Sequence, residues 1–213
     1  MSHNFRNRWK EVWQQLGAHQ VPQVVFEELI RAYSSADRFY HNLTHIEDCL
    51  SMFDQTKFLA AHPEEVELAI WFHDVVYDTR RNDNEQKSAE WAESVIIQAG
   101  LDLVIAERVS RSILATRHDM ELTGADEQLM VDVDLSILGR NENSFWQYEE
   151  NIRKEYAWVP ENVFRQKRIE ILQGFLYRQY IYYHENYREM FEEKARANLN
   201  QAITRLSDVT GSV

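Results

Sequence analysis

Hydrophobic residues recur along nearly the whole chain at spacings of three and four positions, with polar residues between them. That spacing places hydrophobic side chains on one face of an α-helix, whereas a half-buried strand would alternate every second residue. Glycine and proline, which most often interrupt helices, number only 6 and 3. The pattern therefore predicts an all-α protein.

The periodic segments are separated by short polar breaks, and prolines or glycines mark several of their ends. Gly100 and Gly139, for example, follow apolar runs, where a left-handed cap suits glycine. The predicted helices are Phe5–Leu16, Pro22–Tyr33, His41–Phe53, Pro63–Tyr77, Asn84–Gln98, Leu101–Thr116, Ala125–Leu138, Ser144–Tyr156, Glu161–Leu176 and Asn186–Ser207. With 213 residues, we expect a single domain.

Charge and cysteine content narrow the class of protein. The chain has 23 Lys and Arg against 35 Asp and Glu, and its net charge of -12 argues against non-specific nucleic-acid binding or attraction to anionic membranes. The single cysteine, Cys49, excludes an intrachain disulfide and a Cys-cluster zinc site. No apolar run approaches the roughly 18 residues of a membrane span, and no export signal is evident. We expect a cytoplasmic protein with no membrane partner.

Two segments contain histidines that are candidate metal ligands. In FYHNLTHI, His41 and His45 are four residues apart, so a helix would project both rings from one face. In AIWFHDVVYD, His73 and Asp74 interrupt a run typical of a buried helix, and Asp78 follows one turn later. An unpaired buried carboxylate is costly, and a cation is one of the few partners that offset this cost.

A third segment, LMVDVDLSILG, again places acids among aliphatic residues. Asp132 and Asp134 would point in different directions on a helix, so we expect only one of them to bind a metal. Together with the imidazoles of two histidines and the carboxylate of Asp74, that aspartate would form a metal site with both nitrogen and oxygen ligands. Such a site suits Mn, Fe, Ni, Zn or Mg better than a soft metal.

The ordered set resembles the HD-domain metal-dependent phosphohydrolases, and most of all the small bacterial proteins described as predicted HD phosphohydrolases. Two strings, YHNLTH at residues 40–45 and DLS at residues 134–136, are also similar to cyclic-nucleotide phosphodiesterases. The likeness covers roughly residues 39–139, the expected metal-site core, with residues 140–213 as a helical extension of the HD-type bundle. The resemblance implies four metal ligands: His45, His73, Asp74 and Asp134.

The resemblance also implies His41 as the general acid and favours Asp134 over Asp132. The chain departs from the phosphodiesterases, because Tyr77 or Asp78 stands where those enzymes carry a further histidine, and a cyclic nucleotide is therefore not the expected substrate. Dinuclear members of the superfamily insert extra histidines before the last aspartate, whereas this chain has only His118 there. We expect one divalent metal ion per chain.

Together with the metal-binding pattern, the resemblance implies a metal-dependent phosphohydrolase that cleaves a phosphoester of a nucleotide or another small phosphorylated metabolite. The metal would activate a water molecule and polarise a phosphoryl oxygen. Candidates for proton transfer or for orienting water are His41, Asp78, Glu85 and His118. A guanidinium matches phosphate geometry, and the candidate substrate-binding residues are Arg80, Arg81, Arg117, Arg153 and Arg168.

Other interpretations stay open. The chain could instead be a regulatory protein whose metal site stabilises the fold or senses a ligand and catalyses no reaction. Another chemistry of the superfamily, guanosine-polyphosphate hydrolysis or dinuclear-iron oxygenation, is a third alternative. The aromatic stretch at residues 175–183 could support a homodimer or simply pack in a core.

Overall fold

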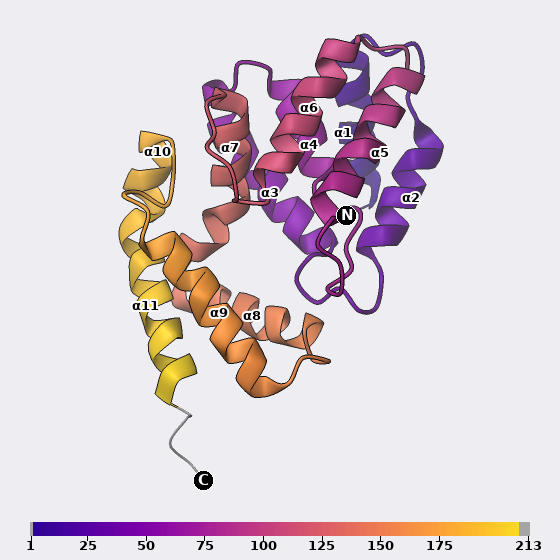
Figure 1. Ribbon diagram of the computed structural model, residues 1–213. Coiled ribbons are helices and arrows are strands. Elements are labelled where there is room, and N and C mark those ends of the chain that lie inside the picture. The colour runs from indigo at the N-terminus through magenta and orange to yellow at the C-terminus, as the bar shows by residue number, and fades with distance from the viewer. Residues whose placement is uncertain (1, 209–213) are drawn as a thin grey trace. The chain divides into compact units, whose positions relative to one another are not determined.

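The computed structural model describes residues 2–208, with side chains from residue 4 onwards. Within these residues the chain forms helices joined by turns, with no β-strand (Figure 1). The all-α prediction is confirmed. Internal contacts divide the chain into two compact units, Met1–Val133 and Asp134–Val213. The prediction of a single domain stays a prediction.

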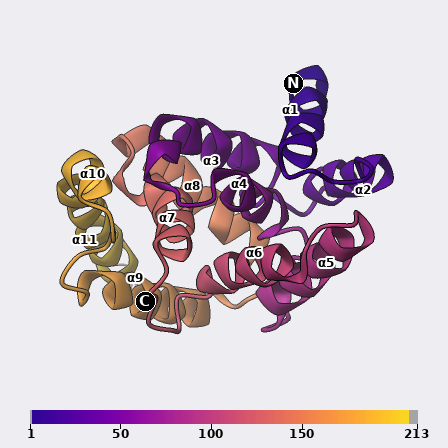
Figure 2. The ribbon, with the colours of Figure 1, turned by 90° about the horizontal axis from the view of Figure 1, so that it is seen from above.

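The first unit is built around helix α4. Its α-helices are α1 (Ser2–Gln15), α2 (Gln23–Tyr33), α3 (Leu43–Thr56), α4 (Pro63–Phe72), α5 (Asn84–Gln98), α6 (Leu103–Ala115) and α7 (Ala125–Asp134), whose last residue begins the second unit; Lys57–Leu59 forms a 3-10 turn. Helix α4 contacts α1, α3, α5 and α6. Helices α5 and α6 lie side by side (Figures 1 and 2).

Helix α4 is held rigidly because most of its surface is buried. Trp71 packs edge-on against Phe5 and Trp9, with ring centroids 5.2 and 5.8 Å apart. Such aromatic contacts add to the free energy gained by burying hydrophobic area. Arg8 of α1 also forms an ion pair with Glu67 at 2.9 Å. The C-terminal end of α4 is therefore a fixed platform for the residues that follow it.

The second unit contains helices that pack mainly around α11. Its elements are a 3-10 helix Leu135–Gly139, α8 (Glu142–Glu155), α9 (Glu161–Leu176), α10 (Glu185–Tyr187), a π-helical turn Arg188–Glu192 and α11 (Glu193–Asp208). Helix α11 contacts α9 and the 3-10 helix. The amide of Asn198 donates to the carbonyl oxygens of Leu138 and Arg140 at 2.8 and 3.0 Å. These bonds fix α11 against the start of the unit.

Two predicted helix boundaries are wrong in ways that affect the site. Helix α3 begins at Leu43, because the side chain of Asn42 accepts from the backbone N–H of Thr44 at 2.9 Å and caps the helix. His41 therefore precedes the helix and does not share a helix face with His45. Helix α4 ends at Phe72 rather than Tyr77, so His73 and Asp74 follow it directly.

The two predicted glycine caps have different outcomes. Gly100 has φ +80°, as a left-handed cap requires, and this prediction is confirmed. Gly139 does not have a positive φ, so the same prediction for Gly139 is wrong. A Cβ at Gly139 would lie 2.5 Å from the Cβ of Phe191, which explains the glycine by close packing within the second unit.

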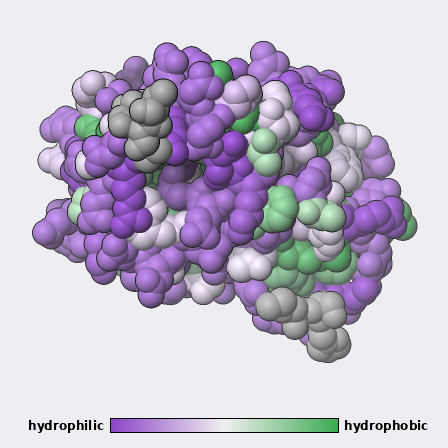
Figure 3. Space-filling model, turned by 90° about the horizontal axis from the view of Figure 1, so that it is seen from below, coloured by the Kyte–Doolittle hydropathy of each residue, from purple (hydrophilic) through white to green (hydrophobic). Residues whose placement is uncertain are grey.

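The surface agrees with a chain in which 27% of residues are charged. Hydrophilic residues cover most of the face drawn in Figure 3, with a smaller hydrophobic area near its edge. Within the described chain, none of the helices combines the length and the apolar character needed to cross a membrane.

Candidate metal centre

Three of the predicted ligands converge beside the start of α3 and the end of α4. His45 lies in the first turn of α3 and is 3% exposed, and His73 is 1% exposed. The backbone N–H of His73 still donates to the carbonyl oxygen of Ala69 at 2.9 Å, which continues the pattern of α4 for one residue. Asp74, next in the chain, retains 16% exposure of its side chain. Packing thus supplies two buried imidazoles and one partly accessible carboxylate.

The distances between the donor atoms match the coordination sphere of a single ion. Nε2 of His45 lies 3.1 Å from Nε2 of His73, and Oδ2 of Asp74 lies 3.0 Å from His73 Nε2 and 3.6 Å from His45 Nε2. Ligands bonded to one ion at about 2.0–2.2 Å lie roughly 2.8–3.6 Å apart, depending on whether the angle is right or tetrahedral. The triangle has the dimensions of one face of a metal site.

The tautomer of His73 strengthens this interpretation. Nδ1 of His73 lies 2.9 Å from the carbonyl oxygen of Ile70, which can only accept, so the proton of neutral His73 is on Nδ1. The lone pair of Nε2 then faces His45 Nε2 and the carboxylate of Asp74. This lone pair and the negative charge of Asp74 repel each other unless a proton or a metal ion lies between them. Fixing a ligating imidazole through a carbonyl on its other nitrogen is the usual outer-shell arrangement at metal sites.

The ionisation state of Asp74 also supports a cation at this site. Burial alone would raise the pKa of its carboxyl group by disfavouring the charged form. When the imidazoles of His73, His41 and His45 are protonated, their positive charges and a hydrogen bond from His73 outweigh burial and lower the pKa below its usual range. Asp74 is therefore an anion stabilised by cations, and either a proton on an imidazole or a metal ion can supply the positive charge.

The fourth predicted ligand, Asp134, is the last residue of α7 and is partly buried. Asp134 is also the first residue of the second unit, and its role as a metal ligand stays a prediction. The neighbouring Asp132 is fully buried.

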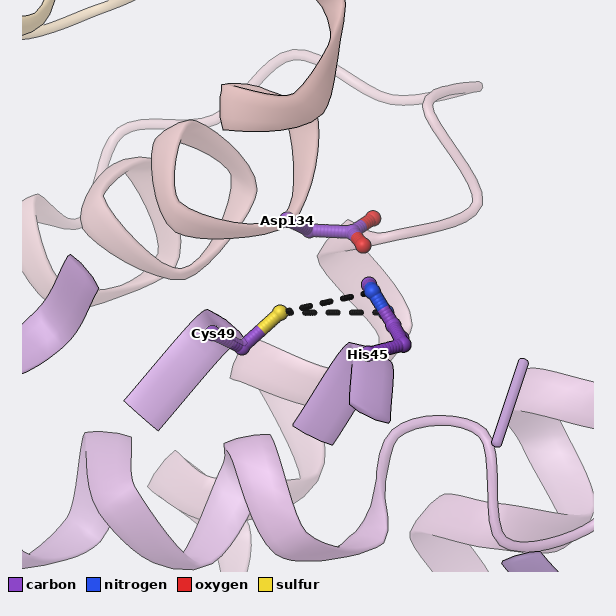
Figure 4. Close-up of side chains that lie close together, drawn as sticks. All are labelled: His45, Cys49 and Asp134. Carbon is purple, nitrogen blue, oxygen red and sulfur yellow. Dashed lines mark hydrogen bonds between the residues drawn. The ribbon is translucent and has the colours of Figure 1, made fainter. Parts of the chain in front are cut away.

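Cys49 is a neighbour that the sequence interpretation missed. Its sulfur lies 3.7 Å from both ring nitrogens of His45 (Figure 4). The signal was available, because Cys49 follows His45 by four residues and therefore shares its face of α3. The sequence interpretation used this cysteine only to exclude disulfides and cysteine clusters.

His41 lies next to the cluster although it is outside the helix. Its ring stacks on that of Tyr77, with centroids 4.2 Å apart and planes inclined by 30°. Its ring centroid is 5.9 Å from that of His45. Being partly exposed, His41 can reach both the cluster and solvent. This position suits a group that exchanges protons near a bound substrate.

The other candidates for proton transfer lie outside the triangle. Asp78 is exposed in a loop, where its carboxylate accepts from the backbone N–H of Arg80 at 2.9 Å. The prediction that Asp78 follows Asp74 by one helical turn is wrong, because α4 has already ended. Glu85 lies in the first turn of α5, and His118 follows α6 with φ 60°. Among the described residues, neither group suited to a metal includes any of these three.

Most of the candidate substrate-binding arginines already have acidic partners. Arg81 pairs with Asp83 at 2.7 Å and Arg117 with Asp119 at 2.9 Å. In the second unit, Arg153 pairs with Glu161 and Arg168 with Glu149. Arg80 is exposed in the loop that follows the cluster. Their role in binding a substrate stays a prediction.

The aromatic stretch at residues 175–183 is partly core and partly surface. Tyr182 is 1% exposed, and its hydroxyl donates to the carbonyl oxygen of Leu135 at 3.0 Å, whereas Tyr177 is 83% exposed. Part of the stretch therefore packs within the second unit, and the homodimer stays a prediction.

Comparison with protein-family models, with curated proteins and with solved structures returns no match. The resemblance to the HD family accordingly stays a prediction from the motifs.

Proposed function

We propose that this protein is a metal-dependent phosphohydrolase with one divalent ion bound by His45, His73 and Asp74. The resemblance of the motifs implies Asp134 as a fourth protein ligand. The observation that carries the proposal is the triangle of donor atoms, with sides of 3.1, 3.0 and 3.6 Å, in which a carbonyl-bound His73 turns a lone pair towards a carboxylate. This donor set of nitrogen and oxygen suits Mn, Fe, Ni, Zn or Mg.

The ion, when bound, would supply Lewis acidity and a water of lowered pKa. His41 would donate a proton to the leaving oxygen, since its ring lies beside the cluster and is partly exposed. Stacking on Tyr77 restricts the orientation of that ring. His73 would keep its Nδ1 proton on the carbonyl of Ile70 throughout, which leaves Nε2 available as a ligand.

The substrate class is a phosphoester of a nucleotide or another small phosphorylated metabolite. Two features support it, the resemblance of the motifs to phosphohydrolases and the exposed Arg80 in the loop immediately after the cluster. A guanidinium there would oppose the negative charge that develops on phosphoryl oxygens in the transition state. The acidic net charge of -12 makes a large polyanion a less suitable partner than a small phosphoester.

The test starts from protein freed of metal with a chelator and reloaded separately with Mn, Fe, Ni, Zn or Mg. Aryl phosphate, bis-aryl phosphate and a nucleotide panel distinguish monoesterase from diesterase activity. We expect metal-dependent hydrolysis by the wild type and none by His73→Ala, with unchanged helical circular dichroism. His19→Ala, an exposed histidine, is the matched control and retains both metal and activity.

Full hydrolysis by His73→Ala would overturn the proposal. Metal binding by the wild type without turnover of any ester would favour the regulatory alternative. Two metal ions per chain would favour a dinuclear centre and reopen oxygenation. Elemental analysis of the purified protein therefore accompanies the activity screen.

A further inference from the structure

Arg38 is a buried cation with an unusual set of partners. The residue is 9% exposed, and no acidic side chain of the described residues forms an ion pair with it. Its guanidinium instead donates to three main-chain carbonyl oxygens. Nη1 donates to Asp74 at 2.6 Å and to His41 at 3.2 Å, and Nη2 donates to Val75 at 2.8 Å. Burying a guanidinium is costly, and the hydrogen bonds to these carbonyl oxygens offset part of that cost.

The three carbonyls come from two segments that are distant in the sequence. One segment contains His41, in the turn before α3, and the other contains Asp74 and Val75, directly after α4. Neither segment has a complete set of helical hydrogen bonds, because each lies at a helix end. Arg38 therefore joins two stretches of backbone that lie just outside the ends of the packed helices α3 and α4.

Aromatic rings enclose the same guanidinium. Its carbon lies 5.1 Å from the ring centroid of Tyr33 and 5.4 Å from that of Tyr77. Tyr77 also stacks on the ring of His41, and the hydroxyl of Tyr33 donates to the carbonyl oxygen of Trp71 at 3.0 Å. Cation–π contacts favour a desolvated guanidinium. The planar fork of arginine, which lysine lacks, can bond all three acceptors at once.

We propose that Arg38 is a positioning residue that fixes the ligand Asp74 and the proton donor His41 in one rigid frame. It acts through the main chain, and it contacts neither substrate nor metal. The role of His41 in this inference rests on the proposed function, whereas the effect on the ligand Asp74 is measurable by metal binding alone.

The first experiment measures metal affinity. Apo wild type, Arg38→Lys and Arg38→Gln are titrated with Mn²⁺, and free Mn²⁺ is followed by its electron paramagnetic resonance signal. Loss of an outer-shell partner of a metal ligand typically weakens binding by about 10- to 100-fold, and we expect that range for both variants. Lysine keeps the charge but cannot reach all three carbonyls, so it should not restore the affinity.

Arg8→Lys is the matched control. Arg8 also connects α3 to α4, through Asp54 at 2.7 Å and Glu67 at 2.9 Å, but it bonds side chains rather than the segments at the site. We expect this variant to lower the melting temperature while leaving Mn²⁺ affinity unchanged. The pair of variants separates a general loss of packing from a specific loss of positioning.

A rescue experiment tests the role of the guanidinium itself. Arg38→Ala leaves a space lined by three carbonyl oxygens and two aromatic rings, and free guanidinium at low millimolar concentration should restore part of the Mn²⁺ affinity. The same addition should have no effect on Arg8→Lys. In the hydrolysis assay, Arg38→Lys should lower kcat more than it raises KM and alter the pH profile, because the proton donor is displaced.

Wild-type Mn²⁺ affinity in folded Arg38→Lys and Arg38→Gln would overturn the inference. Absence of Mn²⁺ binding by the wild type would overturn it as well, since there would be no ligand to position. If the wild type hydrolyses no ester but the Arg38 variants bind Mn²⁺ more weakly than the wild type, only the proposed function is refuted. The two ideas therefore fail on different measurements.

Discussion

Each of the two units contains a buried polar cluster, and the clusters differ in where their positive charge originates. In the second unit, Arg168 is 7% exposed and donates to Glu149 and, at 2.6 Å, to the hydroxyl of Tyr148. Burial alone would lower the pKa of Arg168, but Tyr148 and Glu149 together raise it above its ordinary value. The cluster contains its own permanent cation, and the charge of Glu149 is balanced within the fold.

The cluster in the first unit consists of His45, His73 and Asp74, and none of these three side chains is a permanent cation. His45, His73 and Asp74 bring two imidazole nitrogens and a carboxylate to within 3.6 Å of one another, and His73 directs a lone pair into the group. A proton or a metal ion completes the balance of charge. A buried ion pair such as Arg168–Glu149 keeps the fold in one arrangement, whereas a cluster of imidazoles and a carboxylate suits the binding of an exchangeable cation.

The largest effect should come from removing the permanent cation. Arg168→Met leaves Glu149 buried without its partner, and loss of one member of a buried pair typically costs about 3–5 kcal/mol of stability. Urea unfolding measures this difference. The double variant Arg168→Met/Glu149→Leu should recover most of the loss. If Arg168→Met is as stable as the wild type, Arg168 and Glu149 do not form a stabilising buried ion pair, and the contrast between the two clusters fails.

The next effect concerns the exchangeable cation. Asp74→Asn keeps the shape of the side chain but removes its charge, and we expect Mn²⁺ affinity to fall by at least about 100-fold, equivalent to about 2.7 kcal/mol. Asp48→Asn, at an exposed position of α3, is the control and should bind as the wild type does. Isothermal titration distinguishes them, and equal affinities in the two variants would refute the assignment of Asp74 as a ligand.

Metal loading should stabilise the first cluster in proportion to occupancy. At a free metal concentration ten times Kd, the expected gain in the free energy of unfolding is about 1.4 kcal/mol. A chelator should remove it, and acidification should reduce it because protons compete with the metal for imidazole nitrogen. Calorimetry with and without Mn²⁺ measures the gain. A melting temperature that changes with neither metal nor chelator would contradict the expectation.

The smallest effect concerns Tyr148. Burial raises its pKa, although the charge of Arg168 acts in the opposite direction. A group whose pKa is raised by folding contributes stability below its unfolded pKa, near 10 for tyrosine, and this contribution is lost as pH rises through the folded value. Tyr148→Phe should therefore cost about 1 kcal/mol at pH 8, from the lost hydrogen bond.

That cost should shrink above pH 10, because the phenylalanine variant has no proton to lose. Urea midpoints measured from pH 8 to pH 11 follow the difference. A cost that stays constant across this range would mean that Tyr148 does not titrate differently in the folded state.

The sequence predicted the helices best where one segment contains all the necessary information. Asn84–Gln98 and Glu161–Leu176 have the same bounds in the prediction and in the structure. Their hydrophobic spacing and their polar starts are local properties. The predicted extension of α4 to Tyr77 failed, since an apolar run of residues does not reveal where tertiary contacts end a helix.

The ligand chemistry of the candidate site was also readable from the sequence. His73 and Asp74 stand out in an apolar segment, because a buried imidazole and carboxylate need a partner whatever the fold. The types of donor atom depend only on which side chains are present. The resemblance of the motifs selected His45 rather than His41, and the structure brings His45, His73 and Asp74 together as expected.

The tertiary structure decided the rest. It placed His41 outside the helix, brought Cys49 against His45, and gave Arg38 three carbonyl partners, two of them in a segment 36 or 37 positions away. A hydrogen bond to the backbone of a distant segment leaves no trace in the identity of the acceptor residues, because every residue has a carbonyl. Side-chain chemistry is encoded residue by residue, whereas the distances that make it a site arise only when separate helices pack.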